Sequence, residues 1–379
     1  MRILQWAFPH TMPLGGKEIF TERLSKSFSC SGHQVLLMAD SLTEDSPLHT
    51  FSLLSENIEI HRLNLAAFGR VHSKDSSQTL RGEIKEVIDR FAPDIIHYHN
   101  FYSKSLVFLS AYMRSASRKI PIVYTVHDIE TLSKIPPALS GEVIGNLTDV
   151  IICPSQYIEK RFAALDGLKS KRVMVIENGV PNFQGKSENS ATGTPKKLQI
   201  LAAANFENHK GLIILLTAWS QIQKDFSGVK LIIAGDGKER DFLLNFTQKL
   251  GIQSSVIFPG WMSEKQLQVE FSEDTIVVVP SLIAEAFGLI AAEGQMAGLP
   301  VIASNIGGLI EIIAHDETGF LVPPGSVRAL SSSLIQLLTN EPMRKKMGDA
   351  GRRRAVELFD LEVCASKYLD LFRSLSVRK

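Results

Sequence analysis

The sequence has few cysteines, and their spacing matches no cysteine-based site. Cys30, Cys153 and Cys364 are the only three in 379 residues. They lie too far apart along the chain for the short repeats that bind zinc or form a thiol redox motif. We interpret them as buried thiols in a protein from a reducing compartment.

An excess of charge and long apolar runs are also missing. The 41 basic and 40 acidic residues give a formal net charge of +1, so the protein has no overall field that would attract nucleic acid. No run reaches the ~18 apolar residues that span a bilayer. The strand expected over residues 2–8 follows Met1 too closely for a leader peptide. We expect a cytoplasmic protein with no nucleic-acid partner.

One local excess of positive charge is the run "RKKMGDAGRRR", residues 344–354. It suggests contact with a membrane surface or an acidic partner, which would place the protein peripherally at the inner face of the membrane. The solvated face of a C-terminal helix is the simpler interpretation, and we favour it.

Short β-branched apolar runs alternate with longer helical patterns along the whole chain. The order is visible at the start in "RILQWAF", "KEIFTERLSKSFSCSG" and "HQVLLMAD". Further strands such as "DVIICPS" and "TIVVVP" are almost continuously apolar, which is typical of parallel sheets covered by helices on both faces. A hydrophobic content of 44% suffices for sizeable cores. The alternation predicts an α/β protein with two doubly wound, Rossmann-like domains.

The alternation is interrupted once, in "NFQGKSENSATGTPKK", which is rich in Gly, Ser, Asn, Thr and Lys. We predict one domain over residues 1–183, a linker over 184–196, a second domain over 197–358 and a C-terminal helix over 359–379. This helix could pack on either domain, including back on the first. Its apolar face comprises Leu361, Ala365, Tyr368, Leu369 and Phe372.

Glycines follow two of the expected strands, at the sheet edge where open parallel sheets bind ligands. Gly15 and Gly16 in "PHTMPLGGKE" precede a helix, where bare backbone N–H groups could approach an anion. Taken alone, the pair is more often a plain turn. The run "GDGKER", which begins at Gly235, supplies only the first two glycines of the G-x-G-x-x-G motif. Rossmann-type NAD binding is therefore disfavoured.

Three histidines stand at expected strand ends in the first half. His97 and His99 are two residues apart in "DIIHYHN" and so point to one face, and His127 precedes Asp128 in "TVHD". Three imidazoles and a carboxylate could ligate zinc. They suit hydrogen bonds to a polyhydroxylated ligand equally well, and we favour that interpretation over a metal.

Two carboxylates, Glu285 and Glu293, bracket the run "EAFGLIAAE". The amides of Phe287, Gly288 and Leu289 open a helix and so favour an anion. Glu293 lies roughly 7 Å further along that helix, where it can bind neutral hydroxyls without repelling the anion. Glu285 can reach hydroxyls on the other side. Paired carboxylates also serve glycoside hydrolases, but here the anion site lies between them in sequence.

Lys210 follows His209 in "AANFENHKG", at the start of another helix. A lysine at this place can neutralise a phosphate as a mobile point charge. For this segment in isolation, a solvated lysine in a first helical turn is the favoured interpretation.

These residues together resemble the retaining glycosyltransferases of family four, which have the two-domain fold called GT-B. The most specific match is "PSLIAEAFGLIAAEGQMAGLPVIASNIGGLIEII" followed by "ETGFLVPPG", which is similar to the family's nucleotide-sugar motif almost end to end. Weaker matches include "PLGGKE", "SGHQV", "TVHD" and "IAGDG", so the likeness covers most of the chain. It implies two Rossmann-like domains that face a central cleft.

The resemblance also implies the substrates. The donor would be a nucleotide diphosphate sugar, most often UDP-linked, and the second domain would hold most of it. The acceptor, held by the first domain, would be a saccharide, a lipid-linked saccharide or a small alcohol, as in polysaccharide or glycoconjugate biosynthesis. Transfer would retain the anomeric configuration. The family usually needs no metal, so we expect no cofactor besides the donor.

By the same resemblance, Glu293 would bind the ribose hydroxyls, Glu285 the donor-sugar hydroxyls, and His127 the sugar near the reaction centre. Lys210, Gly16 and the helix amides would hold the diphosphate, whose departure calls for charge stabilisation more than for a general acid. We predict Glu285, His127 and Lys210 as catalytic residues. The predicted donor site comprises Gly15, Gly16, Asn205, Lys210, Gly235, Glu285, Phe287, Gly288, Leu289 and Glu293.

One departure from the family pattern concerns phosphate binding. Ala204 and Asn205 stand where the pattern has a Gly-Arg pair, so a second cation is missing. A charged hydrogen bond contributes about 1.5–3 kcal/mol, against about 1 kcal/mol for a neutral one. Donor affinity is therefore expected to be weak unless a neighbour such as His209 compensates. The departure also leaves open a nucleotide-sugar-binding protein without transferase activity.

Overall fold

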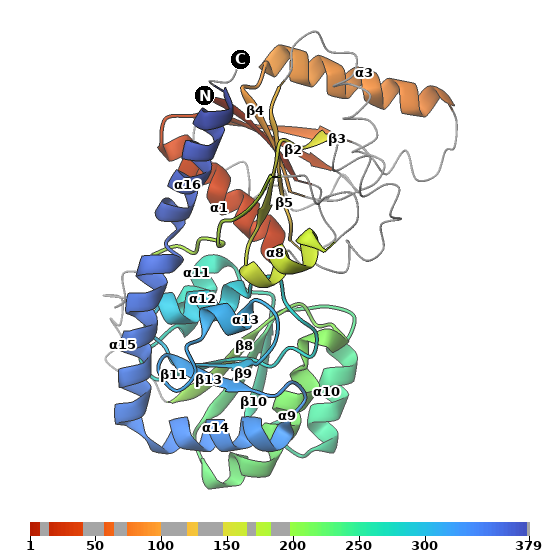
Figure 1. The fold of residues 1–379 in the computed structure, drawn as a ribbon. Coiled ribbons are helices and arrows are strands. Elements are labelled where there is room, and N and C mark those ends of the chain that lie inside the picture. Colours follow the sequence, from red (N-terminus) through yellow and green to blue (C-terminus); the bar gives the residue numbers. More distant parts are fainter. Residues whose placement is uncertain are drawn as a thin grey trace. The chain divides into compact units, whose positions relative to one another are not determined.

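The chain forms two compact units (Figure 1). The computed structural model describes residues 1–7, 15–40, 57–63, 74–99, 120–127, 147–164, 172–182 and 198–376. Unit 1 comprises Met1–Gly179 and Leu361–Lys379, and unit 2 comprises Val180–Asp360. The chain therefore changes units at residues 179/180 and 360/361, near the boundaries expected at 183 and 358. The linker expected over 184–196 lies outside the described residues.

Unit 1 contains a seven-stranded parallel sheet in the order β3-β2-β1-β4-β5-β6-β7. Its strands are β1 Arg2–Ala7, β2 Gln34–Asp40, β3 Ile58–Leu63, β4 Ile95–Tyr98, β5 Ile122–Thr125, β6 Val150–Cys153 and β7 Arg172–Val175. Its described helices are α1 Gly16–Cys30, α3 Lys74–Phe91, α8 Gln156–Ala163 and α16 Leu361–Ser376. The strand order reverses between β1 and β4, which defines the point where such sheets bind ligands.

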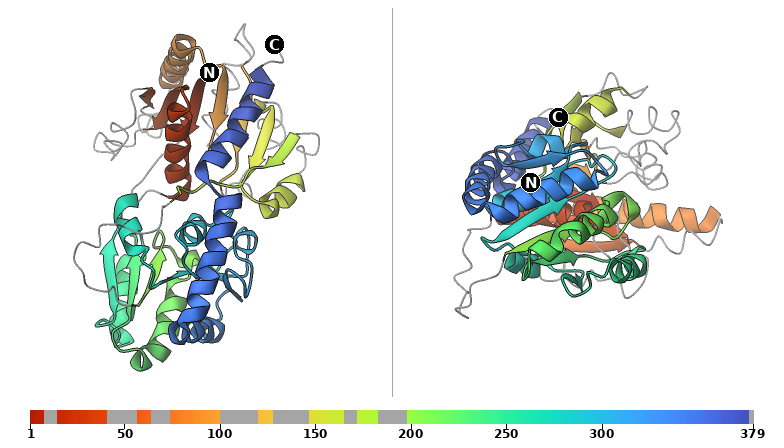
Figure 2. Two further views of the ribbon diagram at one scale, coloured as in Figure 1. Left: turned by 90° about the vertical axis from the view of Figure 1, so that its left-hand side faces the viewer. Right: turned by 90° about the horizontal axis from the view of Figure 1, so that it is seen from below.

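The C-terminal helix α16 packs beside α1 in unit 1 (Figures 1 and 2). The rings of Phe372 and Phe28 meet edge to face at 5.7 Å, and Ser27 Oγ donates a hydrogen bond to Glu362 at 2.7 Å. Sequence reasoning left the partner of this helix open. Its helical apolar period explains the contact, because Ala365, Tyr368, Leu369 and Phe372 are all buried.

Unit 2 contains a six-stranded parallel sheet in the order β10-β9-β8-β11-β12-β13. Its strands are β8 Gln199–Ala203, β9 Lys230–Ala234, β10 Val256–Gly260, β11 Thr275–Val279, β12 Val301–Ser304 and β13 Gly319–Val322. Its α-helices are α9 Leu212–Ile222, α10 Arg240–Lys249, α11 Glu264–Glu270, α12 Leu289–Met296, α13 Leu309–Ile312, α14 Val327–Thr339 and α15 Glu341–Leu358. Here the order reverses between β8 and β11.

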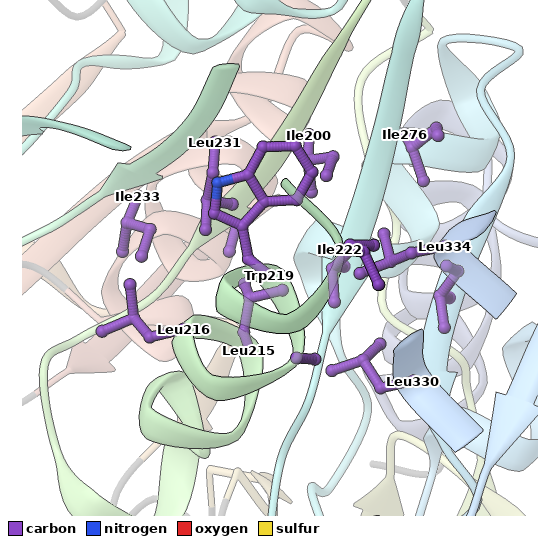
Figure 3. Packing of buried hydrophobic residues seen from close by; sticks show 14 of the residues in the cluster. Ile200, Leu215, Leu216, Trp219, Ile222, Leu231, Ile233, Ile276, Leu330 and Leu334 are labelled. Carbon is purple, nitrogen blue, oxygen red and sulfur yellow. The ribbon is translucent and has the colours of Figure 1, made fainter. Parts of the chain in front are cut away.

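The central strand β11 is apolar after Thr275 because both faces of its sheet are buried. Ile276 and Val278 join the core beneath α9 and α14, whereas Val277 and Val279 join the core beneath α12 and α13. Figure 3 shows Trp219 at the centre of the first core, among residues of α9, α14 and the sheet. Each face is closed by its own set of helices, as the continuous apolar strands predict.

The basic run at residues 344–354 is solvated only in part. Lys345, Lys346 and Arg353 are exposed, as the interpretation of a solvated face expects, whereas three arginines contact neighbouring helices. Arg344 donates to the carbonyl of Leu337 in the last turn of α14 at 2.7 Å, and Arg352 donates to the carbonyl of Met296 at the end of α12. Arg354 donates to two carbonyls of α13, at 3.0 and 2.8 Å. Three arginines of α15 therefore bind the C-terminal carbonyls of three neighbouring helices.

The cysteines agree only in part with the expectation of buried thiols. Cys153 and Cys364 are buried, whereas Cys30, at the end of α1, is exposed. Burial, with the charge of Glu159 as a smaller cause, raises the pKa of the Cys153 thiol to about 12. Within the described parts of the chain, none of the helices combines the length and apolarity needed to cross a bilayer.

The packing around Trp219 predicts a large loss of stability on truncation. Trp219 is fully buried, and its Nε1 donates to Ser255 Oγ at 3.0 Å. We expect Trp219→Ala to lower the free energy of unfolding of unit 2 by about 3–5 kcal/mol, because a cavity replaces the indole. Urea denaturation followed by circular dichroism measures this change. The exposed Phe242 offers a control, since Phe242→Ala should cost less than about 1 kcal/mol; equal losses would contradict the assignment of Trp219 to the core.

Candidate functional site

The loops that follow β8 and β11 contact each other where the strand order of unit 2 reverses. The amide of Leu282 donates to the carbonyl of His209 at 2.7 Å. Gly211 has a φ of +67°, and a Cβ at this position would lie 2.0 Å from the carbonyl oxygen of Pro280. Only glycine permits this approach. The contact fixes the 3₁₀ turn Asn208–Lys210 against the loop that carries Glu285.

A glycine pair after β12 supports the same loop from the other side. The amide of Gly308 donates to the carbonyl of Glu285 at 2.8 Å. A Cβ on Gly307 would lie 2.6 Å from that carbonyl oxygen, and a Cβ on Gly308 would lie 2.6 Å from the carbonyl oxygen of Ala286. The backbone around Glu285 is therefore held between two neighbouring loops, and its side chain starts from a defined place.

The carboxylate of Glu285 has two partners on these loops. Lys210 Nζ donates to its Oε1 at 2.9 Å, and the hydroxyl of Ser281 donates to the same oxygen. Lys210 and Glu285 are only 24% and 17% exposed, so water screens the pair less than a surface ion pair. The structure thus brings together Lys210 and Glu285, which are 75 residues apart in sequence.

The pKa of Glu285 lies below its ordinary value of 4.5. Burial alone would raise this pKa, but the charge of Lys210 and the hydrogen bonds from Ser281 and Lys210 outweigh burial. Because the pKa is lower in the folded state than in the unfolded chain, the ionised carboxylate stabilises the fold at neutral pH. That contribution is lost as the pH falls from 4.5 through the folded-state pKa.

Helix α12 begins at Leu289, directly after Glu285 and its loop. Gly288 precedes it with a φ of +121°, and a Cβ there would lie 2.5 Å from Leu309 Cδ2. No side chain caps this helix start among the residues that the structure describes. Glu293 is buried in the second turn. The arrangement leaves the first amides of α12 without a side-chain acceptor of their own, as an anion site requires.

Asn205 and Gly235 lie in the loops after β8 and β9. Asn205 is half-buried, and its carbonyl accepts a hydrogen bond from the amide of Glu207 at 2.9 Å. His209 Nδ1 lies 3.2 Å from the carboxylate of Glu207, so this ring already has an anionic partner. A Cβ on Gly235, whose φ is +132°, would lie 1.9 Å from the carbonyl oxygen of Ala204. Loop packing alone therefore requires the glycine at 235.

The three histidines of unit 1 are held by hydrogen bonds. His99 Nδ1 lies 3.0 Å from His127 Nε2, and His97 Nε2 lies 2.8 Å from Thr125 Oγ1. Within the described ranges, no group of three or more His, Cys, Asp or Glu side chains could hold a metal ion. Asp128, the carboxylate of the zinc alternative, lies outside those ranges.

All three imidazoles are neutral at physiological pH. Burial, with the charge of Lys17 as a smaller cause, lowers the pKa of His127 to about 3. Burial also lowers the pKa values of His97 and His99 well below 6.5. His127 is the half-buried member, whereas the other two are fully enclosed. These rings are therefore suited to hydrogen bonding with neutral groups.

Gly15 and Gly16 lie where helix α1 begins, in unit 1. Gly15 is extended, and the helix starts at Gly16 without a side-chain cap among the described residues. The loop before Gly15 lies outside them. The glycine pair thus lies at a helix start, as predicted, but the carboxylate of Glu18 in the first turn hydrogen-bonds the backbone amide of Gly15.

Several residues of these sites had no role in the sequence-based prediction. Ser281 lies in the quoted loop, but a serine there carries no distinguishing signal. Gly307 and Gly308 stand out in the sequence as a second glycine pair in a strand-to-helix loop, but their support of Glu285 was not predicted. Gln5, which hydrogen-bonds His99, lies inside a strand that otherwise looks like plain core.

Two family models match the chain. The model for Glycosyltransferase Family 4 matches residues 14–182, and the model for Glycosyl transferases group 1 matches residues 186–354. Glycogen synthase of Mycobacterium tuberculosis (strain CDC 1551 / Oshkosh) is 24% identical over 97% of this chain and 93% of its own length. Phosphatidyl-myo-inositol mannosyltransferase of Mycobacterium leprae (strain TN) is 25% identical over 96% of this chain and 94% of its own length.

Solved structures share the fold. Sucrose-phosphate synthase from Thermosynechococcus elongatus has a TM-score of 0.83 at 22% identity, over 100% of both chains. HepE of Anabaena in complex with UDP and glucose has a TM-score of 0.81 at 20% identity, over 99% of this chain and 100% of its own. Two parallel-sheet, Rossmann-like units of this kind define the GT-B class. The chain belongs to the glycosyltransferases of the family-four type and is a transferase with a nucleotide-sugar donor, as its sequence predicted.

The electrostatics of Glu285 give a prediction that needs no substrate. Lys210→Met removes the neighbouring charge but keeps most of the burial, so we expect the pKa of Glu285 to rise above 4.5. A pH titration of the side-chain carboxyl ¹³C resonance measures it. Lys249→Met, at an exposed position of α10, is the matched control and should leave the pKa below 4.5. A value below 4.5 in both variants would contradict the assigned cause.

Proposed function

We propose that the chain transfers a hexosyl unit from a UDP-sugar to a saccharide, lipid-linked or small-alcohol acceptor, with retention of the anomeric configuration. Structural neighbours support the choice of UDP, since HepE of Anabaena is described in complex with UDP and with UDP-glucose. The named relatives include a glycogen synthase and a phosphatidyl-myo-inositol mannosyltransferase, which support saccharide and lipid-linked acceptors. Polysaccharide or glycoconjugate synthesis is the corresponding process.

The observation that carries the proposal is the pair Lys210–Glu285 beside the start of α12. A cation and a row of helix amides next to each other suit a diphosphate, whose charge grows as the bond to the sugar breaks. Such a leaving group is weakly basic, so stabilising its charge lowers the barrier more than protonating it would. We assign Lys210 and the amides of Phe287, Gly288 and Leu289 to this role.

In the absence of donor, Lys210 forms an ion pair with Glu285. When the diphosphate binds, Lys210 exchanges one anionic partner for another, and Glu285 is released to accept hydrogen bonds from hydroxyls of the donor sugar. Ser281 keeps one oxygen of the carboxylate oriented during this exchange. Before the exchange the carboxylate is ionised because the charge of Lys210 holds its pKa low, and an ionised acceptor forms the stronger hydrogen bond.

The remaining predicted residues receive roles by the same logic. Buried Glu293 on α12 binds the ribose hydroxyls, while Gly15 and Gly16 present amides to the diphosphate. His127, a neutral imidazole, contacts a sugar hydroxyl near the reaction centre. Asn205 and Gly235 border the site, with Asn205 offering a neutral donor to phosphate.

Two substitutions separate binding from transfer. Lys210→Ala should weaken UDP binding about 10- to 150-fold, the equivalent of one lost charged hydrogen bond. Glu285→Gln should keep or improve UDP binding, because it releases Lys210, yet lower kcat by at least about a hundredfold. Calorimetry with UDP and a transfer assay with UDP-glucose measure the two effects, and the anomeric coupling in the NMR spectrum of the product tests retention.

Lys249→Ala serves as the control in both assays, because it removes an exposed lysine elsewhere in unit 2. Wild-type turnover in Glu285→Gln would refute the role of Glu285. Tight binding of GDP but not of UDP would overturn the choice of base while leaving the transferase in place.

Asn205 offers a gain-of-function test. Restoring the arginine of the family pattern, Asn205→Arg, should tighten UDP binding about 2- to 30-fold, the difference between a charged and a neutral hydrogen bond. Calorimetry at two salt concentrations measures this gain, which should shrink at high salt. Asn245→Arg makes the same change at an exposed position of α10 and should have no effect. Equal affinities in both variants would show that position 205 does not face the diphosphate.

A further inference from the structure

A chain of polar side chains runs through the core of unit 1 and ends at His127. Gln5 on β1 and His99 after β4 are both buried, and the Oε1 atom of Gln5 is hydrogen-bonded to His99 Nε2. His99 Nδ1 in turn lies 3.0 Å from His127 Nε2. Gln5 lies on β1, and His99 and His127 follow the ends of β4 and β5, so the pairing of these three strands brings the groups together.

The order of donors and acceptors along this chain follows from its first member. An amide oxygen only accepts hydrogen bonds, so His99 must carry its proton on Nε2 and present a lone pair on Nδ1. His127 must then donate from Nε2 to that lone pair. A neutral imidazole carries one proton, and therefore Nδ1 of His127 is left as an acceptor.

We propose that Gln5 and His99 are positioning residues that fix the tautomer of His127, so that its Nδ1 accepts a hydrogen bond from a substrate hydroxyl. This inference rests on the proposed function, in which His127 contacts a sugar near the reaction centre. A hydroxyl group both donates and accepts, and a fixed acceptor selects one of these two orientations. The hydroxyl then donates its O–H to the histidine, and both lone pairs of its oxygen point away from the ring.

The geometry favours His127 as the end of the chain that meets substrate. It is the half-buried ring of the three, whereas His97 and His99 are enclosed. Its low pKa keeps it from becoming an imidazolium, which would be a donor on both nitrogens. The ring of Phe20 packs 5.9 Å from it and limits its rotation.

A second set of hydrogen bonds in the same core supplies a matched control. His97 Nε2 lies 2.8 Å from Thr125 Oγ1, which lies 3.0 Å from the hydroxyl of Tyr368 on α16. These contacts do not pass through the bond between His99 and His127. Tyr368→Phe removes one buried hydroxyl and should leave the tautomer of His127 unchanged.

The wild-type protein tests the inference directly. Long-range ¹H–¹⁵N correlation spectra of the full chain, labelled with ¹⁵N-histidine, distinguish the two tautomers, and His127→Asn and His99→Asn variants assign the signals. We expect both His99 and His127 to be protonated on Nε2. Protonation of His127 on Nδ1 would overturn the proposal. It would show that the amide of Gln5 is turned, so that the Nε2 of Gln5 and not its Oε1 faces His99.

The variant Gln5→Met tests the positioning role, because methionine fills the space without an amide oxygen. We expect a mixture of His127 tautomers and a fall in kcat/KM for the nucleotide sugar of about fivefold to tenfold, with UDP affinity unchanged. Tyr368→Phe should match the wild type in the tautomer of His127, in kcat/KM and in UDP affinity. Mixed tautomers with unchanged transfer would overturn the positioning role. Absence of transfer from any donor in the wild type would instead refute the proposed function, while the spectra still decide the tautomer.

Discussion

The site of unit 2 depends on the close contact between the loops that follow β8 and β11. These two strands are adjacent in the sheet, and the chain continues from them toward opposite sides of it. The loops after them therefore meet at the carboxyl edge of the sheet. Gly211, after β8, lies so close to the backbone of the β11 loop that only glycine fits there. Gly307, after β12, approaches the backbone of Glu285 equally closely. The ion pair of Lys210 and Glu285 is the result. Because backbone contacts hold both loops, the side chains of the pair start from fixed positions.

Much of this could be predicted from sequence, because the signals are local or periodic. Continuous apolar strands such as β11 indicate a covered parallel sheet, and a helix start at Leu289 follows from the glycine and the apolar run around it. The direct contact of Lys210 with Glu285 could not be predicted, since the two residues are distant in sequence and no local pattern encodes the order of strands. Gln5 was missed for a related reason: inside a buried strand, one polar residue shows its purpose only when its partner is known.

The basic run of α15 is only in part the solvated face that its composition predicts, with Lys345, Lys346 and Arg353 exposed. A cluster of arginines in sequence is typical of a solvated or membrane-facing helix. Arg344, Arg352 and Arg354 instead bind carbonyl groups at the ends of α14, α12 and α13. The guanidinium group suits this use, because it is always charged and donates in several directions. One of these contacts ends α12, the helix whose other end forms part of the proposed diphosphate site.

The two proposed sites hold their buried titratable groups in different protonation states, and the difference suits what each is proposed to bind. In unit 2 the buried carboxylate of Glu285 stays ionised because a lysine and a serine bind it, and a charged site suits an anionic diphosphate. In unit 1 the buried imidazoles are neutral, and His127 owes its donor and acceptor pattern to Gln5 and His99. Sugar hydroxyls carry no charge, so a neutral acceptor of fixed orientation binds them without the desolvation cost of an ion. In the proposed function, the charged pair of unit 2 therefore meets the diphosphate and the donor sugar, and the neutral ring of His127 offers a sugar hydroxyl an acceptor of fixed orientation.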